Sequence, residues 1–486
     1  MRFDHQSRGV RTRLIPSTLF SLMVLGLSAC ANMTGIQPQA MLRDAPSLGL
    51  PASGGTSVTV DTQWWCEFGD EQLNQLVDAA LMTSPSLKMA QARIMRAQAG
   101  IDVTRASNGP QLGASVEATQ QKFTATGMVP PPYAGARLDS GTAQLTGSWE
   151  LDFFGKNRAA LEAAVGNTRA AQADAQAARM LLASNVARSY FQLARLNDQL
   201  GVAQRLLAQR TQLLQLVRDR VNAGLDTRLE QRQSEGGLPD ARLQIEALQE
   251  QLTLTRNALN ALVGQPIQPF ALNLPTLDAI KTGTTVAVIP SDLLGRRADI
   301  AAARWRVEAA VQDVSNAKAQ FYPNVNLVAF AGFSSIGLNN LLGAGSEQWG
   351  VGPALRLPLF DGGRLRANLR GKTADLDAAI ESYNAAVIDA VRDVADQLAS
   401  HQSISRQQTE QHAAQALAEN AYSIAAQRYK AGLINYLGVL NAETTVLNQR
   451  RQGVDLMARA LDTQVALMRA LGGGYRADLP TATAQK

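Results

Sequence analysis

The chain contains one sequence pattern twice. Residues from about 75 to 264 of the 486 return, with drift, from about 288 to 472. A turn motif illustrates the repeat, since it reads Arg220-x-x-Ala223-Gly224-Leu225 in the first half and Arg428-x-x-Ala431-Gly432-Leu433 in the second. A period near 210 residues is far too long for a solenoid, whose repeats are about 20 to 50 residues long. One structural unit has therefore been duplicated, and we expect a pseudo-symmetric fold.

The N-terminus has the pattern of an export signal. Four arginines precede an apolar run from Leu14 to Leu27, and the run is followed by Ser28-Ala29-Cys30. A short apolar run that ends in small residues predicts a secretory signal rather than a membrane span. The Leu-Ser-Ala-Cys ending resembles the lipobox of bacterial lipoproteins, in which Cys30 would be the acylated first residue of the mature chain. The alternative is an ordinary signal with a chance cysteine. Within the resemblance, Ala31 favours export to the outer membrane.

Removal of the signal changes the charge and the cysteine count. Residues 1–29 hold four Arg and one Asp, so the formal charge falls from +5 to +2, and the basic pI does not argue for a nucleic-acid partner. With Cys30 acylated only Cys66 remains, which excludes an intramolecular disulfide. We expect Cys66 to be a buried structural thiol rather than a reactive one. After Ala31 no apolar run approaches 18 residues, so no transmembrane helix is expected.

Each half contains a helical stretch of unusual length. Lys156 to Asn222 holds no Pro and only two Gly, and Arg364 to Lys430 repeats this pattern. A helix of that length would span about 90–100 Å. Each stretch meets Ala-Gly-Leu at its end, where Gly suits a C-terminal cap, and a second helical stretch then runs back. Gly236-Gly237-Leu238-Pro239 predicts a kink or break in the first of these. The drift of the apolar stripes favours a sheet-like wall of helices over the alternative of a soluble coiled coil.

Between the helices, each half carries two stretches with period-two alternation. The alternating apolar positions are Leu145, Gly147, Trp149, Leu151 and Phe153 in the first half and Val351, Pro353, Leu355, Leu357 and Leu359 in the second. Their partner strands are expected at 111–121 and 324–333. Soluble hairpins can alternate in the same way, but membrane barrels need about eight strands or more, and open sheet edges cannot face lipid. If these four strands enter a membrane, several chains must pool them, and three copies would supply twelve.

The arrangement resembles the outer-membrane factor family of Gram-negative exporters, the TolC-like trimeric channel-tunnels, in their lipoprotein (NodT-like) branch. The resemblance extends from about Trp64 to Gly473. The motifs that carry it are Arg296-Arg297-Ala298-Asp299-Ile300, Ala317-Lys318-Ala319-x-Phe321-Tyr322-Pro323, Pro358-Leu359-Phe360-Asp361-Gly362-Gly363 and Trp149-Glu150-Leu151-Asp152-x-Phe154-Gly155-Lys156. The family's block reads Arg-Arg-Pro-Asp-Ile, and this chain departs from it at Ala298.

The resemblance implies a mixed α and β fold. Three copies would form a 12-stranded β-barrel in the outer membrane on a long periplasmic α-helical barrel. The assembly would be the passive exit duct of a tripartite efflux pump, joined through a periplasmic adaptor protein to an inner-membrane transporter, often of the resistance-nodulation-division type. The duct relays whatever its transporter selects, so drugs, metals, solvents and polypeptides are all open as cargo.

Two sets of residues follow as site candidates. We expect the turns Ala223-Gly224-Leu225 and Ala431-Gly432-Leu433 to be the periplasmic tips that meet the adaptor; the alternative is that their glycines merely cap helices. Relatives close the periplasmic end with a ring of Asp, and Gly438 and Asn441 stand where those Asp are expected. Asn441 would form a neutral amide gate that binds cations weakly, unless it lies on a helix flank away from the axis.

Catalysis is not expected. The mature chain has two His, His401 and His412, and it lacks a Cys pair, a His-Glu-x-x-His motif and a Gly-x-Ser-x-Gly motif. No metal and no cofactor besides the lipid on Cys30 is predicted. The competing function is a lipid-anchored periplasmic helical scaffold that binds partners without conducting, and the alternating strands discriminate because a scaffold has no need of them.

The expected divisions of the chain follow the repeat. They are a signal peptide at 1–29, a lipidated segment at 30–74, the first repeat at 75–264 with a hairpin at about 111–153, a linker at 265–287, the second repeat at 288–473 with a hairpin at about 324–359, and a tail at 474–486.

Overall fold

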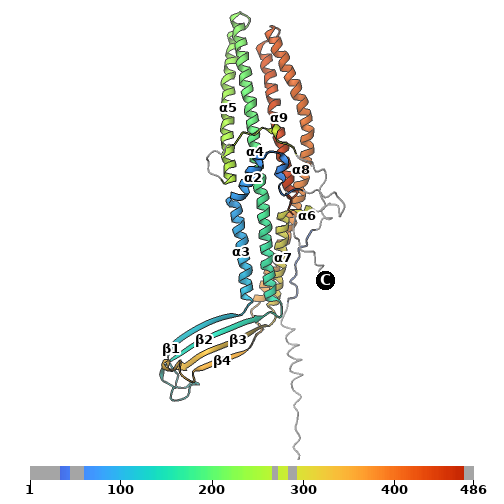
Figure 1. Cartoon of the computed structure of the whole chain (residues 1–486). Coiled ribbons are helices and arrows are strands. Elements are labelled where there is room, and N and C mark those ends of the chain that lie inside the picture. Colours follow the sequence, from blue (N-terminus) through green and yellow to red (C-terminus); the bar gives the residue numbers. More distant parts are fainter. Residues whose placement is uncertain (1–32, 44–59, 265–271, 283–292, 476–486) are drawn as a thin grey trace, which may run out of the picture. The chain divides into compact units, whose positions relative to one another are not determined.

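A computed structural model describes residues 33–43, 60–264, 272–282 and 293–475 (Figure 1). Each half of the described chain has the order helix, two strands, very long helix, returning helix. In the first half these elements are α3 (Pro85–Ser107), β1 (Gln111–Lys122), β2 (Arg137–Leu151), α4 (Lys156–Asn222) and α5 (Arg228–Val263). In the second half they are α7 (Ala298–Ala319), β3 (Asn324–Ile336), β4 (Glu347–Arg356), α8 (Arg364–Lys430) and α9 (Tyr436–Ala470). The shorter elements are η2 (Trp64–Phe68), α2 (Glu71–Thr83), η3 (Leu277–Ala279), α6 (Leu293–Arg296) and η4 (Leu338–Asn340).

The two halves agree closely in the lengths of their helices. Helices α4 and α8 are each 67 residues long, and α5 and α9 are 36 and 35 residues long. At 1.5 Å per residue the longest helices reach about 100 Å. The expected fold class, long helices and β-hairpins in duplicated halves, is confirmed. Among the described residues, no helix is both long enough and apolar enough to cross a membrane.

The four strands form one antiparallel sheet in the order β1-β2-β3-β4. Strand β2 of the first half pairs with β3 of the second, so the sheet joins one hairpin from each repeat. The register sets Leu145 opposite Ala114 on one side and Ala331 on the other, and Ala331 in turn faces Trp349. Within the described chain, the outer edges of β1 and β4 have no paired strand.

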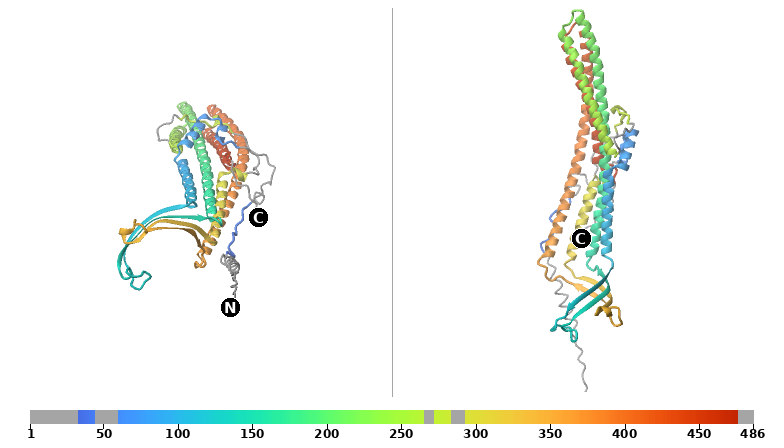
Figure 2. Two further views of the ribbon diagram at one scale, coloured as in Figure 1. Left: turned by 60° about the horizontal axis from the view of Figure 1, so that its bottom comes forward. Right: turned by 90° about the vertical axis from the view of Figure 1, so that its left-hand side faces the viewer.

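The chain divides into two compact units, and each draws on both halves. Unit 1 holds residues 1–41, 97–168 and 306–381, which include the whole sheet and the adjoining helix ends. Unit 2 holds residues 42–96, 169–305 and 382–486, which include the remainder of the long helices. In unit 2, α4 lies beside α5 and α8 beside α9, and both connecting turns lie at the same end (Figures 1 and 2).

An aromatic cluster forms the centre of unit 2. Trp64, Trp65 and Phe68 of η2 are buried, and the Phe68 ring meets the ring of Phe191 on α4 edge-on with centroids 4.9 Å apart. The neighbouring Tyr190 hydroxyl donates to the Asp70 carboxylate at 2.7 Å, and the same Asp70 caps the first turn of α2. Short η2 is therefore fixed to α4 by ring packing, and α2 is fixed to α4 by a hydrogen bond.

One local expectation was wrong, and a second was wrong in part. Cys66 is exposed rather than buried, because the 3₁₀ turn directs the rings of Trp64, Trp65 and Phe68 inward and leaves Cys66 on the opposite side. The expected break at Pro239 is not found, because α5 is one helix from Arg228 to Val263, whereas the alternative of a kink there stays a prediction. Pro239 has no N–H to donate to the Glu235 carbonyl four residues earlier. In the same turn, the Gly237 carbonyl accepts from Arg210 Nη1 of α4 at 2.8 Å, so a contact with α4 holds this part of α5.

The helices of unit 1 approach closely at Gly166 of α4. A Cβ at this position would lie 3.1–3.2 Å from Ala309 of α7. We therefore expect Gly166→Val to lower stability by about 1–3 kcal/mol, the usual cost of overpacking. Gly201→Ala is the control, because Gly201 lies inside the same helix with nothing within 4 Å of its Cβ position. It should raise stability, since Ala favours helix by about 1 kcal/mol over Gly. Thermal unfolding of both variants checks this, and a shift in the same direction for both would contradict it.

Candidate functional site

The two helix-ending turns have the same backbone geometry. Gly224 and Gly432 both adopt φ of +74°, the left-handed conformation that residues with a Cβ avoid. The amide of Leu225 donates to the Arg220 carbonyl at 2.9 Å, and the amide of Leu433 donates to the Arg428 carbonyl at 2.8 Å. This bond from the residue after the glycine back to the last helical turn is a Schellman motif. The expectation that glycine ends each long helix is confirmed.

The returning helices begin with side-chain caps. Thr227 and Glu230 form a capping box, in which the Thr227 amide donates to Glu230 Oε2 at 2.9 Å. In the second half, Asn435 caps α9 by accepting from the Gly438 amide at 3.2 Å. Gly438 therefore stands at the repeat position of Glu230, and it supplies an amide to the cap without a side chain.

The turns expose apolar side chains at the end of unit 2. Leu225 and Leu433 are 65% and 67% exposed, and Leu229 and Leu437 on the first turns of α5 and α9 are 62% and 54% exposed. Four large apolar residues at repeat-related positions therefore face away from the core. Such a surface is typical of a protein contact.

A buried polar cluster connects the two turns. The Arg220 guanidinium binds the Asp226 carboxylate through two bonds of 2.9 and 3.1 Å, and it also donates to the Tyr429 carbonyl at 3.0 Å. The Tyr429 hydroxyl donates to the same carboxylate, and the guanidinium carbon lies 4.7 Å from the centre of the Tyr429 ring. Hydrogen bonding from Arg220 lowers the pKa of Asp226, whereas burial and the bond to Asp226 raise the pKa of Tyr429. The end of α8 is thereby tied to the end of α4.

The repeat does not reproduce this cluster. The counterpart of Asp226 is Ile434, and the counterpart of Tyr429 is Val221. Ile434 packs against the apolar cluster of Tyr429, Tyr436 and Val439. Sequence reasoning missed the cluster, although a carboxylate at a repeat position that otherwise holds isoleucine was the signal that could have found it.

The gate candidates lie on α9. Asn441 is exposed, and its carbonyl accepts from the Thr445 hydroxyl at 3.0 Å. Val439 and Glu443 are buried on the other side of the helix. The structure therefore places the Asn441 side chain on a surface of the single chain, and its role as a gate stays a prediction.

A series of ion pairs joins α4 to α9. Arg188 pairs with Asp462, Arg195 with Asp455 at 2.7 Å, and Arg210 with Glu443 at 3.0 Å. The side chains of the first two pairs are about one third to one half exposed, so these pairs contribute little stability. The third pair is buried, with side-chain exposures of 16% and 4%, and Glu443 Oε1 has no partner. Burial raises the pKa of Glu443, and the Arg210 charge opposes that rise.

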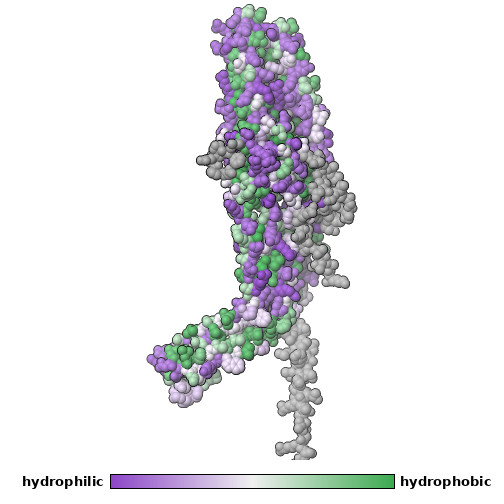
Figure 3. Space-filling model, viewed as in Figure 1, coloured by the Kyte–Doolittle hydropathy of each residue, from purple (hydrophilic) through white to green (hydrophobic). Residues whose placement is uncertain are grey.

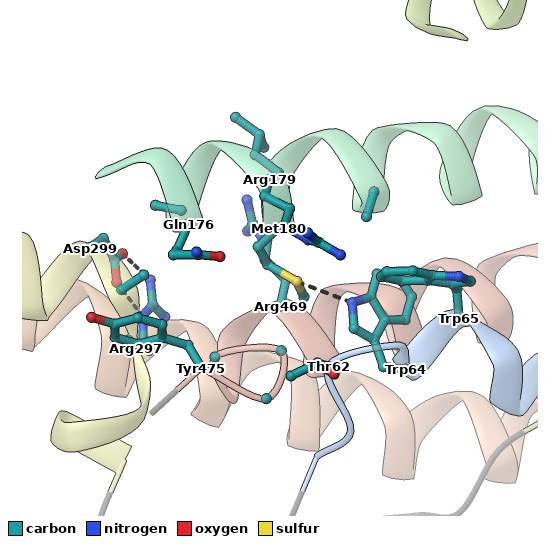
Figure 4. Close-up of a pocket in the computed structure, with 17 residues that line it drawn as sticks. Thr62, Trp64, Trp65, Gln176, Arg179, Met180, Arg297, Asp299, Arg469 and Tyr475 are labelled. Carbon is teal, nitrogen blue, oxygen red and sulfur yellow. Dashed lines mark hydrogen bonds and ion pairs between the residues drawn. The ribbon is translucent and has the colours of Figure 1, made fainter. Parts of the chain in front are cut away.

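The arginine-rich motif at residues 296–300 has a structural role in unit 2 (Figure 4). Arg297 binds Asp299 through bonds of 3.1 and 2.7 Å, and its Nη1 lies 3.6 Å from the Asp393 carboxylate of α8. Burial alone would raise the pKa of Asp299, but the bonds from Arg297 lower it. The Asp299 carboxylate also accepts from the Ile300 amide at 2.9 Å in the first turn of α7. The motif thus fixes the start of α7 against α8.

A cavity of about 650 Å³ adjoins this motif. Arg297, Arg469 and Tyr475 line it together with Trp64 of η2, whose Nε1 donates to the Met180 sulfur at 3.1 Å (Figure 4). In the part of the chain that the structure describes, no cluster of three His, Cys, Asp or Glu could hold a metal ion.

One face of the sheet in unit 1 is apolar across all four strands. The large exposed side chains of this face include Leu112, Val116, Leu145, Trp149, Leu327, Trp349, Val351 and Leu355. Trp349 is 78% exposed and Leu112 is 79% exposed. Hydrophobic residues are visible over the strands in Figure 3. An apolar outer face with alternating polar residues on the other face is the pattern of a strand that contacts lipid.

Apolar strands, open sheet edges and very long paired helices together define an outer membrane efflux channel that extends into the periplasm. The chain belongs to the outer membrane efflux protein family, whose model matches residues 76–265 and 289–473, one match for each half. This is a family of channels rather than enzymes.

Individual relatives cover nearly the whole chain. The multidrug resistance outer membrane protein MdtQ of Escherichia coli O6:H1 is 33% identical over 481 residues, which cover 96% of this chain and 99% of MdtQ. The pyoverdine export outer membrane protein OpmQ of Pseudomonas aeruginosa is 32% identical over 89% of this chain and 92% of OpmQ. The crystal structure of the outer membrane protein VceC from Vibrio cholerae has a TM-score of 0.80 at 37% identity, covering 86% of this chain and 100% of VceC.

The buried pair gives a pH-dependent prediction. Arg210→Met should destabilise the protein by about 3–5 kcal/mol at pH 8, because it leaves a buried carboxylate without its counter-charge. The raised pKa of Glu443 rises further in this variant, so protonation removes much of the penalty by pH 5. Arg188→Met, which removes an exposed pair on the same helix, should change stability by less than about 1 kcal/mol at either pH. Thermal unfolding at both pH values measures this; an equal loss at pH 5 and pH 8 for Arg210→Met contradicts the assignment.

Proposed function

We propose that three copies of this chain form the exit duct of a tripartite efflux pump. Each copy contributes four strands to a closed barrel of twelve in the outer membrane, and the pooled helices form a periplasmic tube. The observation that supports this proposal is the sheet, which is apolar on one face and unpaired at β1 and β4 in the described chain. Unpaired backbone groups in lipid cost several kcal/mol each, so neighbouring copies must pair these edges. The duct conducts passively.

The duct operates with two partners and carries small molecules. A periplasmic adaptor protein connects it to an inner-membrane transporter, which we propose is of the resistance-nodulation-division type and selects the cargo. The names of two relatives, for multidrug resistance and for pyoverdine export, support small organic molecules as that cargo. The apolar sheet face favours this duct over a non-conducting scaffold.

A lipid on Cys30 provides a second membrane contact. Cys30 lies outside the described residues, but the segment 33–43 supports the proposal. The Asp377 carboxylate of α8 accepts from the amides of Gln39 and Ala40 at 2.9 and 3.0 Å, and Arg366 donates to the Thr34 carbonyl at 3.3 Å. Two residues lie between Cys30 and Met33, so three steps along the chain separate them, a reach of about 10 Å. Segment 33–43, which follows the lipidated cysteine, is thereby held against the part of α8 that belongs to unit 1 together with the sheet. Palmitate labelling of the Cys30→Ser variant tests the lipid on Cys30. The variant should incorporate no palmitate, and continued incorporation would exclude lipidation at Cys30.

The division of the chain fits this proposal. Residues 1–29 direct export and are removed, 30–74 carry the lipid, and the repeats at 75–264 and 288–473 build the duct. Residues 265–287 link the repeats, and 474–486 form the tail.

The tips Ala223–Leu225 and Ala431–Leu433 dock the adaptor. Support comes from their exposed leucines and from the Arg220–Asp226–Tyr429 cluster, which ties both tips into one surface. The surface is therefore ordered before a partner binds, which lowers the entropic cost of binding.

The function and the docking surface can be tested together. The purified oligomer should conduct ions in planar bilayers, and the double variant Leu225→Asp, Leu433→Asp should conduct equally well but lose export in cells, because charged tips no longer fit the adaptor. Met128→Asp is the control and should retain both conductance and export, because Met128 is fully exposed in the loop between β1 and β2. Absence of conductance in the unmodified protein contradicts a duct, and full export by the double variant contradicts docking at the tips.

The gate at Gly438 and Asn441 gives a separate prediction. A ring of Asn441 amides closes by neutral hydrogen bonds of about 0.5–1.5 kcal/mol each. Closure should therefore change little between pH 5 and 8, and divalent cations should block weakly. Asn441→Asp should gain cation block from the periplasmic side, whereas Gln233→Glu, at the repeat position on α5, should not. Single-channel recordings decide it: strong block of the unmodified protein, or no change in Asn441→Asp, rejects the gate.

A further inference from the structure

The sheet face opposite the apolar one is polar, with a short apolar interruption on β3. The polar members of this face include Gln111, Ser115, Glu117, Thr142, Gln144, Thr146, Ser148, Asn326, Ser334 and Gln348. The large exceptions are Val328 and Phe330, which are 37% and 38% exposed, together with Leu138 near the start of β2 and Ile336 at the end of β3. In a membrane barrel the polar face lines the lumen. Phe330 therefore stands on the water side of the wall.

Phe330 lies directly over a glycine of the neighbouring strand. The register pairs it with Gly350 of β4, and a Cβ at Gly350 would lie 2.6 Å from the Phe330 ring. On its other side Phe330 faces Thr146, which faces Gly113 of β1. The ring thus occupies space that Gly350 leaves free, an arrangement in which an aromatic side chain covers a strand glycine.

The adjacent row uses a glycine in the same way. Gly332 lies between Gln144 and Gln348, and these two side chains hydrogen-bond to each other across it at 3.2 Å. A Cβ at Gly332 would collide with the backbone of Gln144. In two successive rows, a glycine therefore lets larger side chains lie close to the wall instead of projecting from it.

We propose that Phe330, seated on Gly350, is the apolar contact of the outer-membrane pore for the aromatic or aliphatic parts of its cargo. This inference rests on the three-copy barrel proposed above, in which three such rings stand at one level of the lumen. Val328, two residues earlier on the same strand, extends the apolar surface to the next row. Gly350 keeps each ring flat, so the contact does not narrow the pore.

The chemistry suits a duct for small organic molecules. A wall made only of hydroxyls, amides and carboxylates offers an apolar molecule nothing in exchange for its contacts with water. An aromatic ring gives such a molecule a contact of low polarity, and the Phe330 residue is 38% exposed, so part of its surface is accessible. The contact between Phe330 and the cargo is weak and lies in a water-filled pore, so the cargo can be released.

The orientation can be tested by thiol labelling. In a Cys66→Ser background, Phe330→Cys should react with a charged, membrane-impermeant methanethiosulfonate and thereby change the conductance of the reconstituted channel. Ala329→Cys is the matched control at the same depth on the opposite face, and it should not react. Normal conductance with reaction at Ala329→Cys alone overturns this inference but leaves the duct intact, whereas absence of conductance in the unmodified protein overturns both.

The packing of Phe330 on Gly350 and the contact of Phe330 with cargo are tested by a double-variant cycle. Gly350→Ala should push the ring into the lumen and lower single-channel conductance, and adding Phe330→Ala should restore it. Block by tetraphenylphosphonium, an aromatic cation, should be about 2- to 10-fold weaker in Phe330→Ala, as expected for one lost aromatic contact. Folding of each variant is checked by its migration as an oligomer. Equal conductance of Gly350→Ala and the unmodified channel, or equal block of Phe330→Ala, overturns the proposal.

Discussion

The architecture depends on a four-stranded sheet whose two outer edges are not paired within the described chain. Its four strands present an apolar face, yet β1 and β4 each leave an edge of unpaired amides and carbonyls within the described chain. In water such edges can bind solvent, but in hydrocarbon they cannot. The same sheet therefore favours the membrane through its side chains and opposes it through its backbone. In the proposed assembly, edge-to-edge association of three identical chains removes this conflict and brings the long helices attached to the strands into one tube.

Duplication produced two matched helical pairs, α4 with α5 and α8 with α9. Later divergence gave different side chains to the turns that join the helices of each pair. The lengths of α4 and α8 are identical, and the two glycine turns have the same φ. The polar cluster of Arg220, Asp226 and Tyr429 exists once, because its repeat counterparts are aliphatic. The turn between α4 and α5 is thus held by an ion pair, and the turn between α8 and α9 is held by apolar packing of Ile434. The bonds from Arg220 to Asp226 and to the Tyr429 carbonyl nevertheless join the two turns to each other.

The sequence predicted those features that arise from local rules. The absence of proline over more than sixty residues predicts long helices, glycine after a helix predicts a left-handed cap, and alternation predicts the strands and their two faces. The features that the sequence did not predict depend on tertiary contacts. Pro239 lies within a continuous helix beside a carbonyl that Arg210 contacts, and Cys66 is exposed because neighbouring rings take the buried side of a short turn. The tip cluster and the seat of Phe330 on Gly350 join residues about 200 and 20 positions apart, respectively. No local pattern encodes such pairs.

The most direct test of the closed ring joins its open edges chemically. Each variant carries Cys66→Ser, one introduced cysteine on β1 and one introduced cysteine on β4. Each of these variants is oxidised in the folded, membrane-inserted protein. If β4 of one chain pairs with β1 of the next, a subset of combinations in one register gives disulfide-linked species that end at three chains on a denaturing gel. Combinations on β2 and β3, which already pair within the chain, give only linked monomers. A ladder that stops at two chains, continues beyond three or never forms would contradict a ring of three.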